Sequence, residues 1–302
     1  MRLKREKFKK LMSCALAMFF MVAACVGLGS CTMFPNEYIM EVNTAIIEKD
    51  MQTLQELLEE GGDLNQREFA LSHEFGEGPL VYNRVPLCLA AARNDLAVAK
   101  LLVAYGADVN YTCLNGNDKL APLHHAAGRG NLEMINFLLD NGADVNIQVS
   151  YYGTPISYCL ATSGMVVVDK NGDEDRITVE EMEERRFQAF CLLLERGAEL
   201  ENACVYGHLM FLIIARGKTA IFEYVVENYA IDYNMRMKLR DRYFTDDMDY
   251  TLLMMAAEAG NLAFCQRLLE KGADKNLKNI YNQTAYDIAV EFGHEEVANL
   301  LK

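Results

Sequence analysis

The sequence contains no tryptophan, and among its 302 residues there are only five prolines and five histidines. No His-x-x-x-His or Cys-x-x-Cys pair occurs, which removes the usual zinc signatures. A glycine-rich phosphate loop and a Gly-x-Ser-x-Gly turn are missing as well. These absences argue against catalysis, and we expect a protein that is not an enzyme and needs no cofactor.

Basic residues are scarce once the N-terminus is set aside. Residues 1–30 hold six of the 29 basic side chains and a single acid, Glu6, which leaves 23 basic against 42 acidic side chains in the remainder. A surface this acidic repels a phosphate backbone, so we expect no nucleic-acid partner. The charge predicts instead a basic or mixed-charge protein partner, whose association salt would weaken.

The first 30 residues show the successive segments of an export signal. A basic segment ends at Lys10, an apolar stretch follows, and Leu28-Gly29-Ser30-Cys31 closes it. These four residues resemble the lipobox of bacterial lipoproteins. The resemblance implies a signal peptide over residues 1–30, acylation of Cys31 and a tether over residues 31–36. It places the protein at the bacterial cell envelope, periplasmic or associated with the outer membrane. The alternative is an uncleaved membrane helix, because about 18 apolar residues can just span a bilayer.

One motif recurs along the rest of the chain. Its clearest copies are Gly106-Ala107-Asp108-Val109-Asn110 and Gly142-Ala143-Asp144-Val145-Asn146, and a Pro-Leu-x-x-Ala-Ala segment precedes each, at residues 86–91 and 122–127. These residues resemble the ankyrin repeat, a turn followed by two antiparallel helices. The resemblance implies an all-α ankyrin-repeat solenoid over residues 37–302. About seven repeats are expected, beginning near residues 37, 80, 119, 151, 205, 249 and 282.

Each position of the motif has a physical reason. The paired alanines let the first helix of a repeat approach its neighbours closely, and apolar pairs such as Leu138-Leu139 suit the buried face of the second helix. The glycine that follows can adopt the left-handed conformation that ends a helix. His124 stands where this family places a histidine that bonds to the neighbouring turn, so we expect a structural role for it.

Repeat 4 carries an insertion, expected between its two helices at about residues 163–185. Valines flank Asn171-Gly172 there, which predicts an acidic hairpin with solvated charges. The alternative is a calcium site, because the alternating acids resemble the calcium loop of an EF-hand. Its candidate ligands are Asp169, Asn171, Asp173, Asp175, Glu180 and Glu181.

Six cysteines follow Cys31 in the chain. Export to an oxidising compartment would allow disulfides. We expect all six to remain free thiols acting as small apolar side chains. The alternative is a disulfide between Cys159 and Cys191 on the two helices of repeat 4, the one pairing that the repeat geometry leaves plausible.

The segments that link the repeats, which we call fingers, are rich in tyrosine, a residue enriched at binding hot spots. We therefore predict a protein-binding scaffold that holds its partner on the fingers and on the concave side of the helices. Two alternatives are an immunity-type inhibitor of an envelope-targeted toxin and a calcium-responsive binding module. The predicted partner-binding residues are Tyr82, Tyr111, Tyr151, Tyr152, Tyr206, Tyr243, Phe244 and Tyr281.

Overall fold

The computed structural model describes residues 36–66, 68–72, 80–115, 118–148, 153–160, 178–204, 207–237 and 249–302. For residues 68–72, 80–84, 114–115, 118–119 and 202 only the backbone is described. Residues 36–302 form a unit of their own. The described part of this unit contains seven helix pairs: α2 (Glu37–Ile47) and α3 (Met51–Glu60), α4 (Pro86–Ala92) and α5 (Leu96–Ala104), α6 (Pro122–Arg129) and α7 (Leu132–Asp140), α8 (Pro155–Tyr158) and α9 (Val179–Glu195), α10 (Leu209–Ala215) and α11 (Thr219–Asn228), α12 (Leu252–Glu258) and α13 (Leu262–Glu270), and α14 (Ala285–Glu291) and α15 (Glu295–Leu301).

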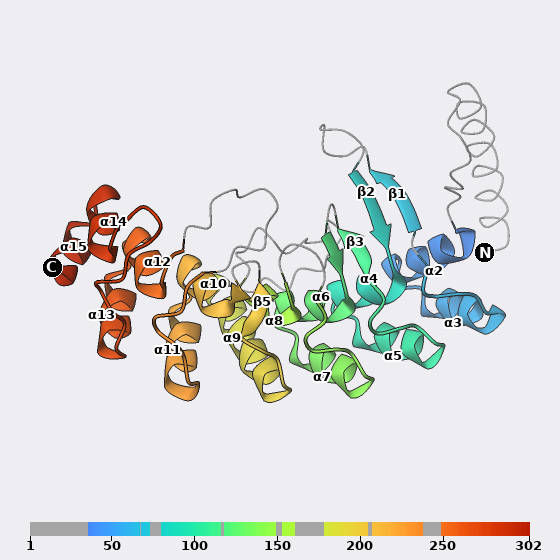
Figure 1. Ribbon diagram of the computed structural model, residues 1–302. Helices are drawn as coiled ribbons and strands as arrows, with labels where there is room; N and C mark the ends of the chain where they lie inside the picture. Colours follow the sequence, from blue (N-terminus) through green and yellow to red (C-terminus); the bar gives the residue numbers. More distant parts are fainter. Residues whose placement is uncertain are drawn as a thin grey trace, which may run out of the picture. The chain divides into compact units, whose positions relative to one another are not determined.

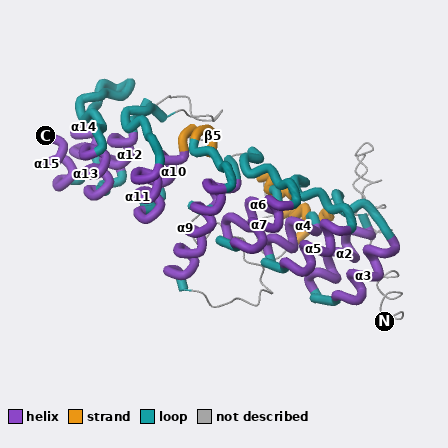
Figure 2. The backbone as a smooth tube through the Cα atoms, turned by 90° about the horizontal axis from the view of Figure 1, so that it is seen from below, coloured by secondary structure: helices purple, strands orange, loops and turns teal. Residues whose placement is uncertain are grey.

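The helix pairs stack in chain order, and their first and second helices form two separate layers (Figures 1 and 2). The first helices pack against each other, as α4 does on α6 and α12 on α14, and make an inner layer. The second helices make an outer layer, in which α7 packs on α9 and α13 on α15. Each repeat therefore buries its apolar faces against its neighbours, as a solenoid requires. The predicted all-α ankyrin solenoid is confirmed.

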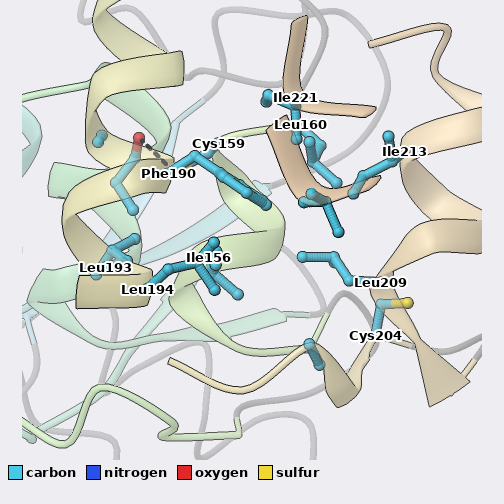
Figure 3. Close-up of a cluster of buried hydrophobic side chains, with 14 of the residues drawn as sticks. Ile156, Cys159, Leu160, Phe190, Leu193, Leu194, Cys204, Leu209, Ile213 and Ile221 are labelled. Carbon is cyan, nitrogen blue, oxygen red and sulfur yellow. Dashed lines mark hydrogen bonds between the residues drawn. The ribbon is translucent and has the colours of Figure 1, made fainter. Parts of the chain in front are cut away.

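One continuous hydrophobic core joins all seven pairs, from Val42 to Leu301. The paired alanines of α4, α6 and α12 are fully buried, which lets neighbouring inner helices approach closely. Leu138 and Leu193 of the outer layer are also buried, as their position in the motif predicts. Figure 3 shows this core between repeats 4 and 5, to which Phe190 and Leu193 of α9, Ile156 of α8 and Leu209 of α10 contribute.

Local chemistry explains where the helices begin. Most outer helices start after an aspartate or asparagine whose side chain accepts a hydrogen bond from the third residue of the helix. Asp95 accepts from the N–H of Val98, and Asn261 accepts from that of Phe264. Three inner helices, α4, α6 and α8, begin with proline, which needs no N–H at that position.

The fingers carry the strands. Strands β1 (Glu68–Ser72), β2 (Leu80–Arg84), β3 (Cys113–Asn115) and β4 (Asp118–Leu120) form one antiparallel sheet in the order β1-β2-β3-β4. Strands β5 (Glu201–Cys204) and β6 (Gly207–His208) make a separate pair. In Figure 1, β1, β2 and β3 project from the inner layer on the side away from α3, α5 and α7. The sheet thus joins the first two fingers into one surface.

Repeat 4 departs from the expected boundary of its insertion. Helix α9 begins at Val179, so that residues 179–185 of the expected insertion 163–185 are helical. The reason is a capping box. Thr178 Oγ1 accepts a hydrogen bond from the N–H of Glu181, and the Glu181 carboxylate accepts one from the N–H of Thr178. The hairpin expected around Asn171-Gly172 lies outside the described residues.

None of the helices that the structure describes between residues 36 and 302 combines the length and the apolar character needed to cross a membrane.

Candidate interaction surface

Five inner helices carry a half-buried residue at the same repeat position. In α4, α6, α8, α10 and α12 this residue is half-buried, while the residue before it and the residue after it are both buried. Equivalent positions of stacked repeats lie on one face, so these side chains form a row. We call the row the inner stripe; it consists of Leu89, His125, Tyr158, Leu212 and Met255.

Four of the five residues in the inner stripe are apolar or aromatic, and they pack in part against the core. The ring of Tyr158 meets that of His124 edge to face, with centroids 5.0 Å apart. Side chains held by a packed core lose little conformational freedom on binding. The stripe therefore offers a preorganised apolar surface.

Two of the predicted partner-binding tyrosines have described side chains. Tyr281 is 54% exposed and lies beside Ile280, which is 53% exposed, at the finger before α14. Tyr111 is half-buried and packs against a small cluster of Val85, Cys88, Cys113 and Leu120. Tyr281 is thus available to a partner, whereas much of Tyr111 supports its own finger.

The remaining predicted site residues are described only in part or not at all. The backbone of Tyr82 pairs with Ala70 in the finger sheet, and its side chain is not described. Glu180 and Glu181 open α9, where Glu181 serves the helix cap. The others lie outside the described residues: Cys31, Tyr151, Tyr152, Tyr206, Tyr243 and Phe244, with the calcium candidates Asp169, Asn171, Asp173 and Asp175.

Tyr250 shows that not every finger tyrosine serves binding. It is only 6% exposed, and its backbone carbonyl accepts a hydrogen bond from the N–H of Met237. Burial, with the carboxylate of Glu258 nearby, raises the pKa of its hydroxyl to about 12. Tyr250 packs the finger of repeat 6 against the core.

The outer layer holds the charge pairs between repeats. Arg267 of α13 reaches Glu223 and Glu227 of α11 as well as Glu270 of its own helix. Arg196 pairs with Asp140 over 2.6 Å in the same way, between repeats 3 and 4. Arg196 and Arg267 therefore form their ion pairs on the outer layer and not on the inner stripe. Exposed acids remain on this layer, among them Glu56, Glu59, Glu133 and Glu184.

His124 has the structural role that its repeat position predicts. It is fully buried; its Nδ1 accepts a hydrogen bond from the N–H of Ala121, and its Nε2 lies 3.3 Å from the carbonyl oxygen of Gly153 in the next repeat. This pattern requires the neutral ring with the proton on Nε2. Burial lowers the pKa of His124 from 6.5 to about 3.

The structure also brings together three side chains that the sequence analysis did not single out as a site. Cys88, Cys113 and His125 bring their donor atoms within 4.8 Å of one another. They come from α4, β3 and α6, so no short sequence spacing reveals them. The hydrogen bond with Cys88 and the neighbouring His125 hold the pKa of the Cys113 thiol well below its usual value. The six cysteines in the described residues are free thiols, Cys159 and Cys191 included.

The family model for ankyrin repeats matches residues 42–149 and 183–302. Among curated proteins, the human NAD-capped RNA hydrolase NUDT12 is 47% identical over 57 residues, which is 19% of this chain and 12% of that protein. A zebrafish (Danio rerio) protein, ankyrin repeat and SAM domain-containing protein 6, is 36% identical over 52 residues, or 17% of this chain and 7% of that protein. The chain thus spans a small part of these relatives.

A solved structure resembles most of this chain. It is the structure of a predatory endopeptidase from Bdellovibrio bacteriovorus in complex with an immunity protein. One of its chains matches with a TM-score of 0.53 and 23% identity, covering 72% of this chain and 97% of that one. At this identity the likeness shows a shared fold.

Proposed function

Because this chain belongs to the ankyrin-repeat family, we propose that it is a non-catalytic scaffold that binds another protein at the bacterial cell envelope. The observation that carries the proposal is the inner stripe, a row of half-buried, mostly apolar side chains on the inner helices. The partner lies along this stripe and against the fingers, where Ile280 and Tyr281 are exposed.

The inner stripe is rigid, and its apolar side chains are easily desolvated. Stripe residues such as Leu212 and Met255 are anchored by buried neighbours, so their ordering costs little when a partner binds. Large apolar or aromatic side chains at the centre of an interface provide most of its binding free energy. The charge pairs between repeats 3 and 4 and between repeats 5 and 6 lie on the outer layer, and none of the five stripe residues is an aspartate, glutamate, lysine or arginine, so little charge has to be desolvated there.

The charge of the molecule indicates the kind of partner. Acidic side chains outnumber basic ones by 43 to 29 over the chain. Complementarity then favours a partner surface that is basic or of mixed charge.

The anchor is proposed from the lipobox-like segment Leu28-Gly29-Ser30-Cys31. Acylation of Cys31 would keep the scaffold at the membrane surface, with a tether of only a few residues before α2. A Cys31→Ser variant is then expected to remain unprocessed and to lose incorporation of a fatty-acid label. Normal processing of that variant would contradict the lipid anchor but leave the binding proposal intact.

Affinity capture from the native cell envelope tests the scaffold. The bait is the full chain, and two lysine variants separate the surfaces: Met255→Lys on the inner stripe and Leu262→Lys at an equally half-buried position of α13 in the outer layer. A stoichiometric partner that is retained by Leu262→Lys and lost by Met255→Lys supports the proposal. Equal capture by both variants would overturn it, provided that their thermal unfolding midpoints are alike.

A second candidate function is an immunity-type inhibitor of an envelope-targeted toxin. The shared fold with a chain from an endopeptidase–immunity protein complex favours it. The test is to add this chain in stoichiometric amount to the captured partner, if that partner is a peptidase. Loss of peptidase activity, reversed by Met255→Lys, supports inhibition, and unchanged activity contradicts it.

A further inference from the structure

We propose that Cys88, Cys113 and His125 form a binding site for a single thiophilic transition-metal cation, Zn²⁺ or Cu⁺. Their three donor atoms lie within 4.8 Å of one another. The Sγ of Cys113 is 3.3 Å from the Nε2 of His125. No other group of three histidine, cysteine or acidic side chains among the described residues brings its donor atoms this close together.

The spacing suits one ion. With metal–sulfur distances near 2.3 Å and metal–nitrogen distances near 2.0 Å, donors around a tetrahedral ion lie roughly 3.5–3.8 Å apart. The distance between Cys113 and His125 is already close to this value. Small side-chain rotations of Cys88 would bring the third donor into place, because all three pairs lie within 4.8 Å.

The surroundings favour a soft cation rather than Ca²⁺ or Mg²⁺. The donors are two sulfurs and an imidazole, the ligands that Zn²⁺ and Cu⁺ prefer. Cys88 and Cys113 are 3% and 5% exposed, and Val85 and Leu120 pack against them. Binding replaces the thiol protons, which leave to the solvent, and His125 binds as the neutral ring.

The same burial argues against a catalytic role for these residues. A catalytic thiol must reach its substrate, but the side chain of Cys113 is enclosed by Tyr111, Leu120 and its neighbours in this cluster. The Cys88 thiol also faces two backbone carbonyls, with Sγ 3.5 Å from the oxygen of Leu120 and 3.6 Å from that of Tyr111. Metal binding would remove the S–H proton that points towards these oxygens, a loss that the bond from the sulfur to the ion must offset.

A bound ion would tie the finger sheet to the helices. Cys88 lies on α4 and His125 on α6, so the ion would bridge the inner helices of repeats 2 and 3. Cys113 opens β3, which pairs with both β2 and β4. The site is thus placed to stabilise the first two fingers, and it does so whether or not the scaffold proposal holds.

Titration of the purified full chain under reducing conditions tests the site. Co²⁺ serves as the spectroscopic probe for zinc, and Zn²⁺ is then added to displace it. We expect a single ion per chain, with the thiolate-to-cobalt absorption of a sulfur-ligated, tetrahedral ion. A parallel titration with Cu⁺, in competition with a copper chelator, shows which of the two cations binds more tightly.

Variants identify the ligands. Cys113→Ser and His125→Ala are each expected to weaken binding at least about tenfold. His125 is half-buried at the surface of the inner layer, so truncation of its side chain is compatible with folding. Cys265→Ser is the matched control, a fully buried thiol on α13 that should leave binding unchanged.

Three results would overturn the site. The first is absence of stoichiometric Co²⁺ and Cu⁺ binding to the reduced, folded chain. The second is binding that survives His125→Ala with unchanged affinity and spectrum. The third is a Cys88–Cys113 disulfide in chain isolated from the cell envelope, seen by mass spectrometry as a loss of two hydrogens, because oxidised sulfurs cannot ligate the ion.

Discussion

The side-chain oxygen of Asn110 accepts a hydrogen bond from the backbone N–H of Asp144, 2.9 Å away in the next repeat. The Nδ2 of Asn110 also donates to the carbonyl oxygen of Gly142, so one side chain bonds two backbone groups of the neighbouring turn. Asn65 and Asn146 repeat this double contact with the turns that follow them. The last residue of the motif therefore acts as a link between repeats.

Removing this link should destabilise the array. Asn110→Ala loses two inter-repeat hydrogen bonds, and we expect the free energy of unfolding to fall by about 1–2 kcal/mol. Asn276→Ala is the matched control, because the Nδ2 of Asn276 bonds only within its own turn, to Asp274. Chemical denaturation of both variants measures the difference, and equal losses would show that the contact between repeats contributes nothing.

The repeat motif could be predicted because its physics is local. Glycine after the outer helix, paired alanines and aspartate turns each act within a few residues, so the periodic sequence was enough to give the number and order of helix pairs. Asn110 illustrates the limit. The sequence shows that this asparagine recurs at the end of the motif. The turn that it binds, at Gly142, becomes known only when the repeats are stacked.

The candidate site depends on long-range contacts, which the sequence does not show. Tyr250 and Tyr281 both stand in fingers, yet one is buried and the other is exposed. Cys88, Cys113 and His125 meet only because two repeats stack beneath a shared sheet. The start of α9 could be predicted from Thr178 and Glu181, whose capping box is local, although the expected insertion extended to about residue 185.

Gly153 should tolerate no side chain. Its φ is +98°, and a Cβ there would collide with the carbonyl oxygen of Ala203. We expect Gly153→Ala to lower the free energy of unfolding by more than about 2 kcal/mol. The alanine would have to adopt a strained φ, and the backbone at Ala203 would have to move away from its Cβ. Gly142→Ala, with a φ of +87° and open space around its Cβ, should cost about 1 kcal/mol. Thermal or chemical unfolding separates the two, and similar losses would argue that φ alone matters.

Stability should fall on acidification because His124 is buried in its neutral form. Its pKa is about 3 in the folded protein against 6.5 ordinarily, so the unfolded chain binds a proton first. The contribution of His124 is fully present above pH 6.5 and is lost as the pH falls towards 3, at up to about 1.4 kcal/mol per pH unit. A His124→Gln variant should be less stable at neutral pH but show a shallower pH slope. An unchanged slope would exclude His124 as the source.

Arg186 is expected to stabilise the contact between repeats 3 and 4. It is 1% exposed, its Nε donates to the carbonyl oxygen of Gly128 over 2.9 Å, and its guanidinium lies 3.5 Å from Glu183. Burial lowers its pKa. Arg186→Ala leaves a cavity and a buried carbonyl without this donor, and should cost about 2–4 kcal/mol. The adjacent, exposed Arg185→Ala should change stability little, and a comparable loss in both would contradict this role.

Partner binding should depend on Tyr281. Its ring is 54% exposed next to Ile280, so truncation removes contact area without disturbing the core. A tyrosine that anchors an interface contributes roughly 1–2 kcal/mol, so Tyr281→Ala should weaken affinity for the captured partner by about tenfold, mainly by faster dissociation. Val179→Ala, which truncates a side chain that is 62% exposed at the start of α9, is the control. Binding kinetics measured for both variants against the wild-type chain give the answer. If Tyr281→Ala dissociates no faster than Val179→Ala, the last finger lies outside the interface, and the partner is bound by the inner stripe and the other fingers.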